Sequence, residues 1–205
     1  MIPPADGVLR LKEGNRRFLS GTGRADKLAN EARRRELTRG QNPFAIILGC
    51  SDARVPAEII FDQGLGDLFV VRVAGNIVAP SLIGSVEFAA ERFGTKLVVV
   101  LGHTGCGAIL ATLEELRRPT ESQSPNLRSI VDRVRPAVEA LFKGDYAEDE
   151  VVMEHRAVRA NIEASARQLR HGSQILERLI EEEGLCVVGA EYSLETGEVD
   201  FFEGV

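Results

Sequence analysis

Three side chains that can bind a soft or borderline metal stand at two places in the sequence. Cys50 ends one apolar run, and His103 and Cys106 follow the end of another, with two residues between them. Two thiolates and an imidazole suit zinc, and three protein ligands leave a fourth position open for water. This composition is typical of catalytic zinc, because structural zinc takes four protein ligands. The sequence therefore predicts a catalytic zinc site.

The remaining cysteine and histidines are not expected to complete this site. Cys186 lies in the apolar run 185–190 and is expected to be a core residue of a strand. His155 and His171 lie in charged helical stretches, where a solvated or hydrogen-bonded histidine is the common case. A part in proton transfer stays open for both histidines.

The segment CSDAR places two charged residues directly after the first ligand. Asp52 could accept a hydrogen bond from a water on the metal, and Arg54 could hold the carboxylate by charge-assisted hydrogen bonds. In the segment HTGCGA, Gly105 and Gly107 allow the backbone to approach the metal, and the helix that follows points its amides toward a developing anion. We therefore expect Asp52 and Arg54 to be catalytic.

Other charged residues receive no catalytic role. Asp62, Glu87 and Glu91 are expected on the polar faces of amphipathic helices. Arg72 lies inside an apolar strand, where a guanidinium must be paired. It is expected to be either a buried ion-pair partner or an interface residue.

Alternating strands and helices would position the candidate ligands. Four runs are apolar at nearly every position, as parallel strands covered on both faces are, and they span 44–50, 68–73, 96–102 and 185–190. Helical patterns separate them, which predicts an α/β fold with a mainly parallel sheet of four to five strands flanked by helices. Ligands gather at the carboxyl ends of such strands, so Cys50 meets His103 if the first and third strands are neighbours.

Three further segments complete the predicted fold, which is a single domain over residues 1–205. Residues 1–40 form an N-terminal helical arm. Two long amphipathic helices, 127–142 and 151–169, form a helical insertion before the last strands. A hairpin-like pair of strands, 191–194 and 198–202, ends the chain.

Composition excludes several classes of protein. Hydrophobic residues make up 44% and charged residues 27% of the chain, which is the balance of a globular domain. The net charge of −6 comes without a basic block, so no nucleic-acid partner is expected. Apolar runs fall short of the roughly 20 residues of a membrane span, and no membrane partner is expected. The N-terminus lacks a signal-peptide pattern and the three cysteines form no disulfide framework, which predicts a cytoplasmic protein.

With these motifs the sequence resembles the β-class carbonic anhydrases. The family's C-x-D-x-R and H-x-x-C motifs stand here as Cys50, Asp52, Arg54, His103 and Cys106, and the segments 61–76 and 84–94 also match. The resemblance implies a zinc enzyme that hydrates carbon dioxide reversibly to bicarbonate and a proton. Zinc-bound hydroxide, oriented by the Asp-Arg pair, would attack the substrate. The family also implies a homodimer or a dimer of dimers, with each site at a subunit interface.

The resemblance further implies a set of substrate-binding residues. Gln41, Phe69, Ala74 and Phe88 would line a small pocket, and the amide of Gly107 would face a substrate oxygen. We expect the N-terminal arm to lie across the partner subunit and some pocket residues to be supplied by that subunit.

Three alternatives remain at this point. The same metal site could hydrolyse carbon disulfide or carbonyl sulfide. The metal could instead only stabilise the fold, although Arg54 would then have no purpose. The segment GHTGCG after a strand imitates a phosphate-binding loop, but its glycine spacing differs from the G-x-G-x-x-G fingerprint of a nucleotide-binding module.

Overall fold

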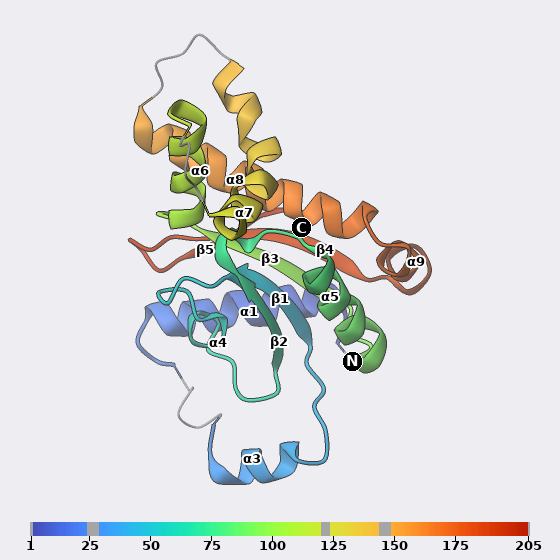
Figure 1. Ribbon diagram of the computed structural model, residues 1–205. Coiled ribbons are helices and arrows are strands. Elements are labelled where there is room, and N and C mark those ends of the chain that lie inside the picture. Colours follow the sequence, from blue (N-terminus) through green and yellow to red (C-terminus); the bar gives the residue numbers. More distant parts are fainter. Residues whose placement is uncertain (1, 24–28, 120–123, 144–148, 205) are drawn as a thin grey trace.

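A five-stranded sheet forms the centre of the protein in the computed structural model, which describes residues 2–23, 29–119, 124–143 and 149–204 (Figure 1). The spatial order is β2-β1-β3-β4-β5, in which the first four strands are parallel and β5 is antiparallel to β4. The strands are β1 (Ala45–Cys50), β2 (Leu68–Val73), β3 (Leu97–His103), β4 (Cys186–Tyr192) and β5 (Val199–Glu203). The predicted fold class and the pairing of the first and third strands are confirmed.

Alternate residues of the central strands enter two separate cores. In β1, Ile46 and Leu48 face one core, while Ala45 and Ile47 face the other. All six residues of β1 and all seven of β3 are buried. Both faces of the sheet are therefore covered, which explains why these strands read as continuous apolar runs.

Five helices of the described residues cover the first face. Their apolar sides pack against Ile46, Leu48 and Val100. The helices are α5 (Pro80–Phe93), α6 (Gly107–Arg117), α7 (Pro125–Val138), α8 (Glu150–His171) and α9 (Gln174–Glu183). A 3-10 turn, Glu139–Lys143, extends α7, so the first helix of the predicted insertion ends earlier than expected. The sequence also predicts a polar loop over 119–125 and an acidic separator over 144–150, and both segments fall largely outside the described residues.

The second face is covered by α1 (Pro4–Leu19) and the short helix α4 (Ala57–Ile60). Val8 and Leu11 of α1 are buried in this core, so α1 belongs to the domain of its own chain. The helix α3 (Glu31–Leu37) buries no residue and lies apart from the sheet (Figure 1). Within the described part of the arm, α3 is thus the helix that stands free of the sheet.

Two smaller expectations need correction. The strand β4 continues to Tyr192, so the final hairpin joins β4 to β5 and residues 191–194 do not form a strand of their own. Asp62 does not lie on a solvated polar face, because its side chain is 2% exposed and accepts a hydrogen bond from Arg17 Nε at 2.5 Å. Among the described helices, no segment is both long and apolar enough to span a membrane.

At Gly14 the helix α1 packs directly against the backbone that follows α4. A Cβ atom at this position would lie 1.7 Å from the carbonyl oxygen of Phe61, which belongs to the backbone and cannot rotate away. We expect Gly14→Ala to lower the free energy of unfolding by about 3 kcal/mol, the upper range for overpacking. Urea unfolding measures this change.

The matched control is Glu13→Ala, one residue earlier on the exposed side of α1. It should change the free energy of unfolding by less than about 0.5 kcal/mol. Equal unfolding midpoints for the two variants would contradict the tight packing of α1 on its own sheet.

Candidate metal centre

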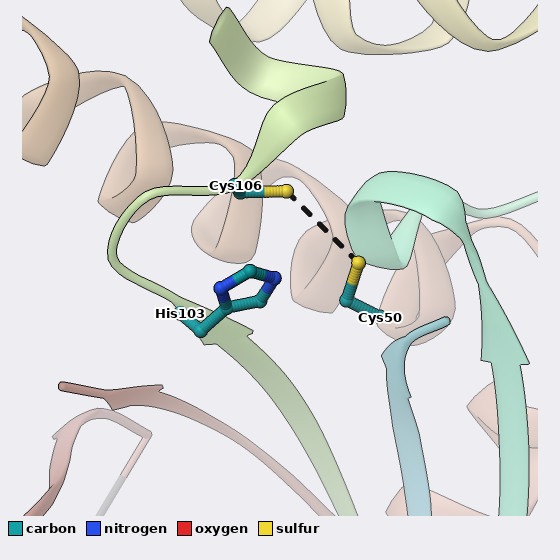
Figure 2. Close-up of side chains that lie close together, drawn as sticks. All are labelled: Cys50, His103 and Cys106. Atoms are coloured by element: carbon teal, nitrogen blue, oxygen red, sulfur yellow. Dashed lines mark hydrogen bonds between the residues drawn. The ribbon is translucent and has the colours of Figure 1, made fainter. Parts of the chain in front are cut away.

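The ends of two neighbouring strands bring the three candidate ligands together. Cys50 is the last residue of β1, His103 is the last residue of β3, and Cys106 immediately precedes α6. Their side chains point toward one another (Figure 2), with the three ligand atoms within 4.8 Å of one another and all three residues buried. The structure therefore gathers two sulfurs and one imidazole at the carboxyl edge of the sheet.

The distances and the hydrogen bonds of this cluster fit a zinc ion. The two Sγ atoms are 4.0 Å apart, close to the separation of about 3.8 Å between sulfurs on tetrahedral zinc. His103 Nδ1 lies 2.8 Å from the Thr104 carbonyl, to which it donates, so Nε2 carries the lone pair. That buried Nε2 has no hydrogen-bond partner among the described residues. A metal ligand role would satisfy this nitrogen, and the carbonyl contact would fix its ring.

The surroundings of Cys50 favour its thiolate form. The thiol of Cys106 lowers the pKa of Cys50 against the opposing effect of burial, and the backbone amides of Asp52 and Gly75 add to the lowering. Both amides lie 3.4 Å from Cys50 Sγ. The same contact between the sulfurs raises the pKa of Cys106. The thiolate is the form that binds a metal.

Asp52 faces the three candidate ligands while Arg54 holds it. Asp52 Oδ1 accepts hydrogen bonds from the Arg54 backbone amide and from Nε, both at 2.9 Å, and Oδ2 accepts one from Nη2 at 2.7 Å. Oδ2 also lies 3.9 Å from His103 Nε2. The Arg54 guanidinium holds the pKa of Asp52 well below its usual range, so the carboxylate remains ionised.

Contacts with the backbone fix the loop that carries Asp52. Arg54 Nη2 donates to the carbonyl of Gly105 at 3.1 Å, which ties the two ligand-bearing loops together. Arg72 donates from Nε to the carbonyl of Cys50 at 2.9 Å and from Nη2 to the carbonyl of Asp52 at 2.6 Å. Arg72 is exposed and binds carbonyls, so the expectation of a buried ion-pair partner is wrong, and the alternative of an interface residue stays a prediction.

The five predicted substrate-binding residues fall into two groups. Ala74 follows Val73, which pairs with Cys50, and Gly107 follows Cys106 at the start of α6, so both adjoin the ligands. The other three, Gln41, Phe69 and Phe88, lie toward the opposite ends of the strands.

The separation of this second group follows from the strand register. Phe69 pairs with Ile46, four residues before Cys50, or about 13 Å along the strand. Phe69 and Phe88 form an aromatic cluster with a ring-centroid distance of 6.3 Å, and Phe88 is 54% exposed. Gln41 is exposed just before β1. A single chain does not bring these three side chains to the metal centre.

Helix α8 supplies polar contacts that the sequence analysis did not anticipate. Glu154 Oε1 accepts the Gly105 amide at 2.7 Å, Asn161 Nδ2 donates to the Gly75 carbonyl at 2.8 Å, and Ser165 Oγ donates to the Asn76 carbonyl at 3.1 Å. Asn161 and Ser165 lie among the buried apolar residues of α8. Two polar residues four positions apart on the apolar side of a helix are a signal that could have singled them out.

The remaining histidines and cysteine lie outside the cluster. His155 Nε2 is 3.0 Å from Glu191 Oε2, with half of its side chain exposed, and His171 is exposed at the end of α8. Cys186 is half-buried at the start of β4. None of the three contributes a ligand atom to the metal centre.

Comparison with known proteins gives a consistent result. Residues 45–199 match the family model described as carbonic anhydrase. A carbonic anhydrase of Mycolicibacterium smegmatis is 38% identical over 193 residues, which cover 93% of this chain and 89% of that protein. Carbonic anhydrase 2 of Mycobacterium tuberculosis is 41% identical over 187 residues, covering 91% of this chain and 87% of that protein.

Solved structures agree with the sequence relatives. The β-carbonic anhydrase CafA of Aspergillus fumigatus aligns with a TM-score of 0.75 at 25% identity, over 84% of this chain and 81% of that chain. One of two tetrameric β-carbonic anhydrases of Sordaria macrospora aligns with a TM-score of 0.71 at 27% identity, over 84% and 87% of the two chains.

Proposed function

The chain belongs to the β-carbonic anhydrase family, and from this premise we propose that it hydrates carbon dioxide reversibly to bicarbonate and a proton with zinc held by Cys50, His103 and Cys106. The observation that carries the proposal is the buried, unpartnered Nε2 of His103 beside two sulfurs 4.0 Å apart. This donor set is one that zinc prefers, and three protein ligands make the site open.

The chain's own residues would divide the work of the reaction. Bound zinc would supply a Lewis acid that makes hydroxide available near neutral pH. Asp52, ionised and acceptor-only, would orient the attacking oxygen by accepting its proton in a hydrogen bond. Arg54 would keep both carboxylate oxygens occupied. The Gly107 amide at the start of α6 would donate to a substrate oxygen as bicarbonate forms.

Zinc content and substrate range test this function directly. We expect the purified protein to contain stoichiometric zinc and to hydrate carbon dioxide. Removal of the zinc by a chelator should abolish the activity, because the reaction needs the metal as a Lewis acid. Assays with carbonyl sulfide and carbon disulfide run in parallel. Preferred hydrolysis of either sulfur compound, or a zinc-free protein, would contradict the proposal.

Arg54→Ala tests the role of the Asp-Arg pair. Asp52 lies two residues from a candidate ligand and could itself bind the metal through oxygen once it is released from Arg54. We expect the variant to stay folded and retain zinc, with carbon dioxide hydration reduced at least about 100-fold, the upper range for residues that support ligands. Zinc analysis, a hydration assay and a crystal structure of the variant measure these effects.

The matched control is Arg128→Ala, which removes an exposed arginine of α7 far along the chain from the site. It should leave both the zinc content and the hydration rate unchanged. Full activity of Arg54→Ala would show that Arg54 does not hold Asp52 for catalysis, whereas loss of zinc would show that the pair supports metal binding instead.

We further propose that the active form is a homodimer or a dimer of dimers. The support comes from the position of Gln41, Phe69 and Phe88, which lie away from the metal centre of their own chain. A second copy could present these side chains to the site. The similarity to tetrameric β-carbonic anhydrases of Sordaria macrospora is in line with such an assembly.

Hybrid dimers provide a test of this shared site. A Cys50→Ala chain and a Phe88→Ala chain are each expected to be inactive alone. Co-expressed in equal amounts, they should recover about a quarter of the wild-type activity, because half of the random two-fold dimers contain one intact site. Activity is measured on the purified mixture. If the mixture stays as inactive as its components, Phe88 does not act across the interface.

A further inference from the structure

Two buried polar residues of α8 hold one backbone turn beside the metal centre. Asn161 is 2% exposed and Ser165 is 5% exposed. They donate to consecutive carbonyls, Asn161 to Gly75 at 2.8 Å and Ser165 to Asn76 at 3.1 Å. They are one helical turn apart, so both hydrogen bonds form from the same side of α8.

The turn that they hold has an uncommon backbone conformation. Gly75 has a φ of 72° and Asn76 a φ of 42°, so two successive residues lie in the left-handed region. For asparagine this conformation costs free energy that the surroundings must offset. A Cβ atom at Gly75 would lie 3.0 Å from the Cβ of Ala108, which shows that the turn is also packed against α6.

This conformation directs the amide of Gly75 at a candidate ligand. Gly75 N lies 3.4 Å from Cys50 Sγ and donates to it, as the amide of Asp52 does at the same distance. Hydrogen bonds to a ligating sulfur orient it and withdraw part of its negative charge, which alters how strongly it binds a metal. Gly75 therefore connects α8 to the candidate metal centre, because its carbonyl accepts from Asn161 and its amide donates to Cys50 Sγ.

We infer that Asn161 and Ser165 are positioning residues that act through the Gly75–Asn76 turn on the Cys50 sulfur. This inference rests on the proposed function, since it requires Cys50 to bind zinc. Helix α8 thus helps to set the metal affinity and the electronic character of the Cys50 thiolate, in addition to packing on the sheet. A merely structural role would affect stability and leave the metal unchanged.

The test compares metal binding in wild type and in two variants, Asn161→Ala and Ser165→Ala. Zinc affinity is measured by competition with a chelator, and the zinc is then replaced by cobalt to record the thiolate-to-cobalt absorption band. We expect Asn161→Ala to bind zinc about 10-fold more weakly and to shift the cobalt band. Ser165→Ala, which removes a single hydroxyl, should show a smaller change in the same direction. This variant provides the test on its own if Asn161→Ala does not fold.

Val158→Ala is the matched control, because it truncates another buried residue of α8 while the two hydrogen bonds of Asn161 and Ser165 to the turn remain. It should destabilise the protein but keep the zinc affinity and the cobalt band of wild type. Wild-type affinity and an unshifted band in folded Asn161→Ala and Ser165→Ala would overturn the inference while the proposed function stands. A wild-type protein that binds neither zinc nor cobalt would overturn the proposed function, and this inference with it.

Discussion

The pairing of β1 with β3 is the constraint on which the candidate metal centre depends. The parallel ladder sets Gly49 opposite Leu101, so both strands end at the same edge, where Cys50 and His103 meet. A shift of one residue would move every side chain of β1 to the other face of the sheet. The two apolar cores oppose such a shift, and the sheet's packing thereby fixes the distance between ligands that are far apart in sequence.

Packing brings the ligands together, but hydrogen bonds to the backbone decide how they face one another. Glu154 holds the amide of Gly105, whose carbonyl accepts from Arg54, and Arg54 in turn holds Asp52. A second path runs from Asn161 through Gly75 to the Cys50 sulfur. Both paths start on α8, which also packs on β3 and β4. One helix thus restrains the charged pair and one sulfur relative to the same sheet.

The sequence indicates some of these features and not others, for physical reasons. Cys50, His103 and Cys106 follow apolar strands, and the rule that parallel strands share a carboxyl edge is enough to predict their meeting. The contacts of α8 are with backbone carbonyls and amides in turns, which leave no mark on the residue types of those turns. Asp62 is buried, contrary to the prediction of a polar-face position. Its own backbone, just after α4, has a φ of 46° and turns the side chain inward toward Arg17.

The same reasoning explains why three predicted pocket residues lie apart from the ligands. In parallel strands, residues near the amino ends cannot reach the carboxyl edge of their own sheet, and Phe69 pairs with Ile46 near the start of β1. Around Phe69 the chain presents the edge strand β2 and the exposed ring of Phe88. Apolar surface of this kind is stabilised by burial against another surface. A second copy of the chain would cover it and, under the proposed function, complete the pocket above the metal centre.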